Sequence, residues 1–402
     1  MTGPTSGRRG GGALAAAQAV TAAMLGPFPA FLTGALAVFI TEDIPMGPGD
    51  VGIAVAVLYV ASAVTSPTAG ARVQAIGARW SLTTAGSCAG IALLGMALAG
   101  RWWHLALWLV VAGVGNAMAQ PAANLLISGA IDDRRLGTAF GVKQSAIPAA
   151  TLLAGLAVPV IGAGLGWRWA YAGFAVLAFA FAAAAATSRA RRAPTRVRGG
   201  PAGRTTRLPV LVVLTVGGGL GAAATTTLGA FLVGTGIASG VSTSLSGIMV
   251  SVASVLGMVS RVLIGAAIDH PHPRAPKDAF RVVTVLMVVG SLAYAVLAAE
   301  VPLLYVLGAI GGYTIAWGWM GVFHFGVVRE NRASAASATG IIMTGTTLGA
   351  GLGPLGFGQL VEAFGYPAGW LATALVSCVA GLLVWLGRRL LEASRPESAP
   401  VA

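Results

Sequence analysis

The sequence predicts an all-α membrane protein with twelve transmembrane helices, and three observations support this prediction. First, 56% of the 402 residues are hydrophobic and 9% are charged, with a mean hydropathy of +0.83. This leaves too few charges to solvate the surface of a soluble protein of this size. Second, the apolar runs have the length of about 20 residues that a helix needs to cross a bilayer. Third, the basic residues lie between these runs, which favours membrane topology over a nucleic-acid-binding surface.

The first apolar run, 13–40, is interrupted by Pro27 and Pro29. Because it is longer than the signal-peptide core of about 7 to 15 residues, we expect a retained first span. The other predicted spans have the approximate limits 51–69, 81–100, 105–127, 136–165, 170–186, 208–233, 246–267, 280–299, 302–327, 334–360 and 370–386. Strands of a membrane barrel need about 10 alternating residues, so runs of this length indicate a helical bundle.

The distribution of basic residues predicts the orientation of the spans. If the N-terminus lies in the cytoplasm, only Arg101 and Arg168 fall in external loops, and the other 23 of the 25 basic residues lie on the cytoplasmic side. The positive-inside rule therefore places both termini in the cytoplasm. Arginine outnumbers lysine, and alanine and glycine are abundant, which indicates a bacterial plasma membrane. Cys88 and Cys378 lie in apolar runs of opposite halves, where we expect packing residues without a disulfide.

The segment 187–207 holds seven arginines and no acidic residue, and proline and glycine interrupt it. This composition is typical of a flexible cytoplasmic linker. Setting the topology is one role for its charge, and binding anionic lipid is the alternative. The linker divides the chain into an N-terminal six-helix half, 1–186, and a C-terminal six-helix half, 208–390, followed by a cytoplasmic tail, 391–402.

The two halves carry matching patterns. Gly70 precedes the third predicted span as Gly265 precedes the ninth, and Gly141 and Gly166 match Gly340 and Gly365 at a spacing of 199 residues. Two parallel six-span repeats joined by a basic loop are typical of secondary transporters whose halves rock about a site near the membrane midplane.

With these motifs the chain resembles the major facilitator superfamily over nearly its whole length. In that family a Gly-x-x-x-Asp with basic residues follows the second span of each half. The C-terminal copy here keeps Gly265 and Asp269, whereas the N-terminal copy has Gln74 in place of the acid. The resemblance implies gating roles for Gly70, Gln74, Gly77, Arg79, Gly265 and Asp269. Asp269 would then face the positive N-terminal end of the fifth span.

The resemblance also covers Gly349-x-x-x-Gly353-Pro354 in the eleventh span, which is similar to an element that exporters carry in their fifth span. We therefore add Gly349, Gly353 and Pro354 to the gating candidates. The chain departs from the family in the fourth span, where Leu109 replaces a buried arginine of the usual proton-coupling arrangement.

Two cations lie within predicted spans. Lys143 and Gln144 occur in the fifth span, and Arg261 occurs in the eighth, about 12 Å along a helix from Asp269. The resemblance implies that these spans face each other across a central cavity. Because no Asp or Glu lies in the interior of a predicted span, the unpaired cations favour an anionic ligand.

Arg261-x-x-x-Gly265 is similar to the arginine element of monocarboxylate and oxalate-type carriers, and a guanidinium suits a carboxylate. The alternative is that Arg261 and Lys143 extend to lipid headgroups or belong to the gate.

Other polar residues are weaker candidates for contact with solute. Tyr313, Trp317 and His324 lie in the tenth span, where the aromatic rings can stack on a flat solute or pack in the interior. His324 is a candidate for coupling to H⁺. Asn116, Gln120 and Asn124 recur at a spacing of four and share one face of the fourth helix.

These features predict a monomeric secondary transporter without a cofactor or metal, which moves a small organic anion by alternating access. Efflux of an amphipathic drug or metabolite is the alternative within the same superfamily. A membrane-embedded enzyme would need clustered nucleophiles, carboxylates or metal ligands, and a channel would need a filter element; neither pattern occurs.

Overall fold

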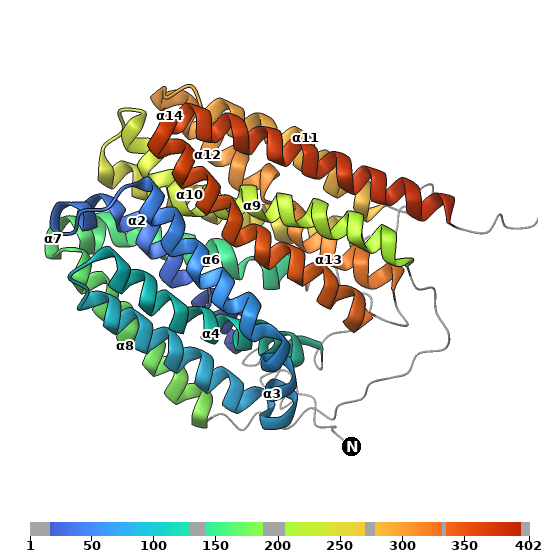
Figure 1. Ribbon diagram of the computed structural model, residues 1–402, viewed down its shortest axis with the longest axis horizontal. Coiled ribbons are helices and arrows are strands. Elements are labelled where there is room, and N and C mark those ends of the chain that lie inside the picture. Colours follow the sequence, from blue (N-terminus) through green and yellow to red (C-terminus); the bar gives the residue numbers. More distant parts are fainter. Residues whose placement is uncertain (1–16, 129–140, 188–205, 270–277, 332–334, 395–402) are drawn as a thin grey trace, which may run out of the picture.

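The computed structural model describes residues 17–128, 141–187, 206–269, 278–331 and 335–394, and every regular element in these ranges is a helix (Figure 1). A short first helix covers Ala17–Leu25. The elements that follow, with η for a π-helical turn, are α2 (Phe28–Asp43), α3 (Pro48–Ala97), α4 (Trp102–Ser128), α6 (Ala146–Ala157), η2 (Val158–Gly162), α7 (Ala163–Leu165), α8 (Trp167–Thr187), α9 (Leu208–Ala238), α10 (Thr243–Asp269), α11 (Ala279–Leu297), α12 (Pro302–Gly311), η3 (Gly312–Ala316), α13 (Trp319–Glu330) and α14 (Ala335–Ala393).

Ten helices in the described ranges are long and apolar enough to cross a membrane, or eleven if one bent pair counts as a single span. The pair is Ala17–Leu25 with Phe28–Asp43, bent by 51°. Pro27 lies at the break, and because proline cannot donate a backbone hydrogen bond it interrupts the helix where the sequence predicted an interruption.

The longest apolar helix, Ala338–Ala393, has 56 residues. A straight helix of that length would extend about 84 Å, whereas the apolar core of a bilayer is about 30 Å thick. Gly365 leaves the helical conformation with φ 81° and ψ 170°, and Figure 1 shows that the chain reverses direction within α14.

Two glycines with positive φ angles lie at chain reversals, and the sequence repeat had matched these two glycines to each other. Gly166 has φ 92° with ψ 158°, close to the angles of Gly365, 199 residues further along. An L-residue with a Cβ strongly disfavours this conformation, which explains glycine at both positions.

The bundle has two ends that differ in their connections. The turns around 44–47, 98–101, 166, 239–242, 298–301 and 365 lie at one end, which we call the short-loop end and which is on the left in Figure 1. The opposite end holds the break at Gly77 and the helix ends at Thr187 and Leu208 that flank the basic segment. We call it the linker end.

Charges and apolar side chains are distributed as a membrane requires. The ion pairs in the described ranges lie at the ends of the bundle: Arg168 with Asp43 at the short-loop end, and Arg388 with Asp278 and Glu392 at the linker end. Large apolar side chains face outwards along the helices, such as Val176, Leu263 and Leu375, each more than 60% exposed. An apolar exterior between charged ends fits a surrounding bilayer.

Candidate solute-binding site

Arg261 lies in the interior of α10, and its side chain is 2% exposed. Its Nη1 donates a 2.8 Å hydrogen bond to the carbonyl oxygen of Gly257, one turn earlier on the same helix. Glycine provides the space for this conformation, because a Cβ at position 257 would lie 3.0 Å from Nη1. The Arg261 side chain therefore folds back along its own helix, over the space that Gly257 leaves open.

The Arg261 guanidinium has no acidic partner in the described part of the chain. Its Nε and Nη2 atoms are buried without a hydrogen-bond acceptor. The guanidinium carbon lies 5.3 Å from the ring centroid of Trp317, within cation–π range. With this contact in place, Nε and Nη2 are still available to bind a ligand.

A π-helical turn positions the aromatic residues of this site. Tyr313 lies within η3, and the backbone N–H of Trp317 donates to the carbonyl oxygen of Gly312 over 2.8 Å, five residues earlier. Such turns insert one residue into a helix and are frequent at functional sites. Both side chains are buried, and their ring centroids lie 5.2 Å apart.

The aromatic cluster also reaches the N-terminal half. Phe31 of α2 approaches Trp317 edge to face, with ring centroids 6.2 Å apart. Gly229 of α9 lies beneath this contact, because a Cβ there would come within 2.6 Å of Phe31 and 3.1 Å of Trp317. Three helices therefore meet at the Trp317 ring.

Lys143 lies in a second polar cluster nearer the linker end. Lys143 and Gln144 are each 8% exposed, and His324 is 7% exposed. The Gln144 side-chain nitrogen lies 3.5 Å from His324 Nδ1, at the limit of a hydrogen bond. His324 also contacts the Met320 carbonyl oxygen at 2.8 Å and the Met343 sulfur at 3.3 Å.

The sequence predicted Lys143 and Arg261 on spans that face each other across one cavity, and the structure gives each cation its own neighbours. Lys143 interacts electrostatically with His324, whereas Arg261 interacts with Tyr294 and Tyr313. His324 follows Trp317 by seven residues on one span, or about 10 Å along the helix. The tenth span therefore connects the two cation clusters.

The polar face predicted on α4 packs within the N-terminal half. Asn116 is buried, its side-chain amide donates to the Ser62 hydroxyl over 3.0 Å, and its oxygen occupies the space above Gly26. Gln120 is half-buried, and the side chain of Asn124 is outside the described residues.

The predicted gating residues fall into two groups. At the linker end, Gly70 and Gly77 have open space where a Cβ would lie, and Arg79 is exposed with its guanidinium 5.1 Å from the Trp80 ring. The side chains of Gln74 and Asp269 and the start of the fifth span are outside the described residues, so the predicted contact of Asp269 with that helix end is untested.

The second group lies in α14. A Cβ at Gly349 or Gly353 would collide with the backbone of α9, so both glycines allow packing within the C-terminal half. The carbonyl of Pro354 instead faces Gly52 of α3, in the other half. Of these three residues, Pro354 is the one that lies at a contact between the halves.

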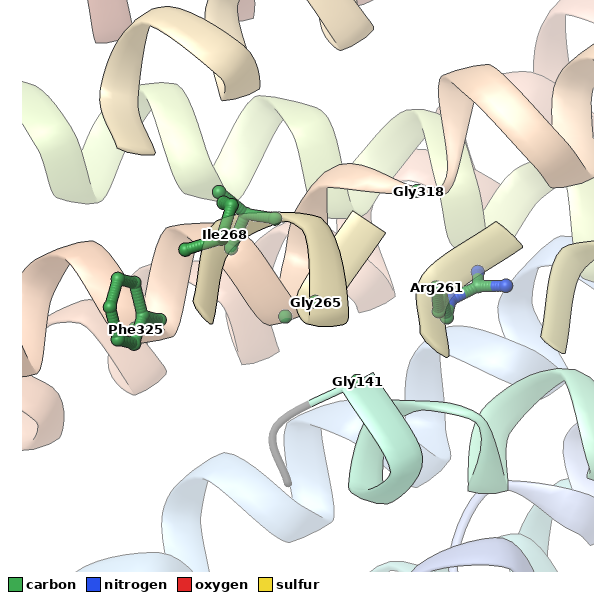
Figure 2. A pocket seen from close by; sticks show the side chains of 8 residues that line it. Gly141, Arg261, Gly265, Ile268, Gly318 and Phe325 are labelled. Carbon is green, nitrogen blue, oxygen red and sulfur yellow. The ribbon is translucent and has the colours of Figure 1, made fainter. Parts of the chain in front are cut away.

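A narrow crevice surrounds the backbone side of Arg261. It has no room for a water molecule, and Gly141 and Gly265 line it together with Ile268 and Phe325. Figure 2 shows the guanidinium nitrogens of Arg261 on the far side from Gly265, Ile268 and Phe325. The crevice is therefore a packing gap at the contact of α10 with its neighbours, and the cationic group points away from it.

A larger cavity of about 300 Å³ lies at the short-loop end between α2, the start of α3 and α9. Its walls are mostly apolar and include Val38, Phe231, Val233 and Ile237, with Tyr366 at its edge. None of the predicted solute-binding residues lines this cavity.

Sequence reasoning missed one residue of the Arg261 cluster. Tyr294 lies three residues before the C-terminal end of α11, is completely buried and stacks with Trp370, and it interacts electrostatically with Arg261 and Tyr313. A single tyrosine in an apolar run carries no signal of its own, so contacts between the helices were needed to find it. No group of three His, Cys, Asp or Glu side chains that could hold a metal occurs among the described residues.

Apolar helices long enough to cross a membrane, with the described ion pairs at the ends of the bundle, define an integral membrane protein. The sequence profile of the Major Facilitator Superfamily matches residues 14–338, and the chain belongs to this family. Among curated proteins, none matches the sequence.

Solved structures with the same fold include a bacterial homologue of the human lysosomal transporter Spinster. Its inward-facing, occupied conformation matches with a TM-score of 0.70 and 18% identity, over 96% of this chain and 99% of that chain. The inward-facing, unoccupied conformation matches with a TM-score of 0.68 and 16% identity, over 99% and 100%. At these identities the likeness establishes the fold and leaves the solute open.

Proposed function

We propose that this transporter moves a small organic anion across the plasma membrane by alternating access, with a carboxylate bound at Arg261. One observation carries the proposal: the guanidinium is 2% exposed, and no carboxylate in the described part of the chain neutralises it. An unpaired cation at membrane depth is costly, and an anionic solute offsets that cost when it binds. The flat guanidinium edge suits a two-point contact with a carboxylate.

The Lys143 cluster is proposed as a second position on the same path, nearer the linker end. A cationic side chain beside Gln144 and His324 would attract the anion as it leaves Arg261. His324 is proposed as the group that couples transport to H⁺, because it is the histidine of this buried cluster. At the linker end, the segments Gly70–Arg79 and Gly265–Asp269 are proposed as the gate.

The proposed topology has twelve spans in two six-helix halves, since division of Ala338–Ala393 at Gly365 adds one span to the eleven. The basic residues support a cytoplasmic linker end with both termini on that side, and we propose a monomer. In a background without Cys88 and Cys378, an impermeant thiol reagent added to intact cells should label a cysteine at Glu300 and leave one at Arg79 unlabelled. The reverse pattern would invert the topology.

Transport into proteoliposomes tests the solute class. Labelled oxalate, lactate and benzoate should be taken up or exchanged by the wild type. Arg261→Met should reduce this transport at least about 100-fold, because it removes a charged hydrogen-bonding pair. Arg281→Met, at an exposed position at the start of α11, is the matched control and should transport normally.

The variant must also be shown to fold. Replacing an unpaired buried charge by an apolar side chain should leave the melting temperature of the purified protein unchanged or higher. Lys143→Met should raise the KM with a smaller loss of rate. Normal carboxylate transport by Arg261→Met, or export of a cationic dye that neither substitution affects, would contradict the proposal and favour drug efflux.

A further inference from the structure

The first turn of α3 is hydrogen-bonded to one carboxylate from each half of the protein. A helix leaves its first backbone N–H groups without partners, and Pro48 at the first helical position has no N–H to satisfy. The N–H of Gly47 donates to Oδ2 of Asp50 over 2.9 Å, within the N-terminal half. The N–H of Gly49 donates to Oε2 of Glu362 over 3.1 Å, and Glu362 lies on α14 in the C-terminal half. The second hydrogen bond therefore connects the halves.

The glycine at position 49 allows Glu362 to reach the backbone of α3. A Cβ there would collide with Oε2 of Glu362 and would lie 2.7 Å from Nε2 of Gln359. Any other residue would therefore displace the carboxylate. Because the colliding atoms are the ends of flexible side chains, the displacement costs little, and Gly49→Ala should still fold.

Glu362 lies at the outer end of a close contact between α3 and α14. Along this contact a Cβ at Gly52 would collide with the Pro354 carbonyl, and a Cβ at Gly358 would collide with the Pro48 carbonyl. Pro354, Gly358 and Glu362 recur at a spacing of four and share one face of α14. Pro48 also lines the cavity of about 300 Å³ at the short-loop end. The contact therefore closes one side of that cavity.

The hydrogen bond from Gly49 to Glu362 is also an electrostatic contact. The N-terminal end of a helix carries a partial positive charge, which a nearby carboxylate stabilises. No basic residue in the described ranges pairs with Glu362, and its side chain is exposed. Protons from the solvent can therefore reach the carboxylate and remove the charge that the end of α3 attracts.

We infer that Glu362 is a pH-sensitive contact that holds the two halves together at the short-loop end. This inference rests on the alternating access of the proposed function and does not depend on the solute. Opening at this end separates Glu362 from Gly49, because the two residues lie on opposite sides of the contact. The ionised carboxylate stabilises the closed arrangement at neutral pH, and this stabilisation is lost as acid protonates the carboxylate. A lower pH at this end therefore favours opening.

The other titratable groups around this contact do not bridge the halves. The cavity wall formed by α9 carries no ionisable side chain between Leu208 and Ala238. Asp50 is bonded at its own helix end, and Asp43 of α2 is paired with Arg168 of α8. The remaining groups are Glu42, which precedes Asp43, and Tyr366 with Glu300, which interact electrostatically within the C-terminal half.

Three substitutions separate the charge, the hydrogen bond and the helix end. Glu362→Gln keeps the shape and a carbonyl acceptor but removes the charge, so it should increase opening at neutral pH about 2- to 5-fold. Gly49→Ala displaces the carboxylate and should act in the same direction. The double variant should add little to Gly49→Ala alone, because both substitutions remove one contact. Asp50→Asn is the matched control, since it removes a carboxylate from the same helix end within one half and should not increase opening.

Opening is measured as the labelling rate of a cysteine at Val233, which is 3% exposed and lines the cavity. The assay uses the purified full-length protein in detergent, with Cys88 and Cys378 replaced by serine, so that the thiol reagent reaches both ends. At pH 7.5, E362Q should be labelled about 2- to 5-fold faster than the parent. The ratio of the two rates should fall towards 1 at pH 4, and it cancels the titration of the thiol itself.

The inference is overturned if E362Q and the parent are labelled equally at pH 7.5, if their ratio does not fall with pH, or if D50N increases labelling as much as E362Q does. Gly52→Ala distinguishes this failure from that of the proposed function. If Gly52→Ala is labelled faster than the parent while E362Q is not, only the inference fails. If neither variant is labelled faster, the halves do not separate at this end, and the proposed alternating access fails with it.

Discussion

Two contacts between the halves of the protein differ in kind. At the short-loop end, glycines bring helix backbones into direct contact: a Cβ at Gly52 of α3 would collide with the Pro354 carbonyl of α14, and one at Gly358 would collide with the Pro48 carbonyl. Towards the linker end one backbone contact remains, at Gly141, where a Cβ would lie 2.7 Å from the Arg261 carbonyl oxygen, and beside it the side chains of Gln144 and His324 meet at 3.5 Å. The halves therefore combine close backbone contacts with one looser polar contact.

This difference indicates which of the two contacts tolerates an amino-acid substitution. Backbone atoms cannot rotate away from an added methyl group, whereas a side chain can adopt another rotamer. Small residues that allow close helix approach are the usual means of packing in membranes, where no hydrophobic effect drives helices together. We expect substitutions at the Gly52–Pro354 backbone contact to act on the closing of the halves, and substitutions at the Gln144–His324 side-chain contact to have smaller effects on it.

The largest expected effect is that of Gly52→Ala. The added methyl group would push α3 away from Pro354, and overpacking of this kind costs about 1 to 3 kcal/mol. That cost should shift the protein towards opening at the short-loop end by roughly 5- to 150-fold. Gly356→Ala is the control, because Gly356 follows Pro354 by two residues on α14 and a Cβ there meets no atom within 4 Å.

The shift can be measured with a cysteine at Val233, which is 3% exposed and lines the cavity at the short-loop end. With Cys88 and Cys378 replaced by serine, an impermeant thiol reagent should label this cysteine faster in Gly52→Ala than in the parent. Equal labelling rates in Gly52→Ala and Gly356→Ala would show that the backbone contact does not control closure.

An intermediate effect is expected between the fifth and eighth spans. A Cβ at Gly155 would lie 2.6 Å from the carbonyl oxygen of Gly247, and a Cβ at Gly247 would lie 2.6 Å from that of Gly155. Either alanine variant should therefore lower the transport rate and the melting temperature. Because both substitutions separate the same two helices, the double variant should lose less than the two single losses added together. Full additivity of the changes in melting temperature would contradict a shared contact.

The smallest expected effect belongs to the linker end. Gln144→Leu removes a long and weak hydrogen bond and keeps most of the side-chain volume. We expect a stability change below about 0.5 kcal/mol, and a labelling rate at position 233 equal to that of the parent. A change in the labelling rate as large as that of Gly52→Ala would remove the distinction between the two contacts.

The fold was largely readable from the sequence because its causes are local. The lengths of the apolar runs predicted the spans, and Pro27 predicted the bend in the first span. The match of Gly166 with Gly365 predicted two equivalent positions, and both lie at chain reversals. Each of these depends on a property of one residue or one segment, such as the missing Cβ of glycine.

The candidate site was readable only in part because it depends on contacts between spans. Arg261 stands out as a charge in an apolar run, but the burial of Tyr294 against Trp370, within electrostatic range of Arg261, follows from how α11 packs. Asn116 shows the opposite case, since a polar residue on a predicted cavity face bonds to Ser62 of its own half. Periodicity places a residue on a face of its helix, and it does not say which helix lies opposite.

The π-helical turn η3 has a consequence for the tenth span as a whole. One inserted residue rotates everything after it by about 100° relative to a continuous α-helix. Trp317, which stacks with Arg261, and His324, which contacts Gln144, both follow this insertion. If the turn relaxed to an ordinary helix, both side chains would swing together to another face. A single change of register in one helix would therefore separate Trp317 from Arg261 and His324 from Gln144 at the same time.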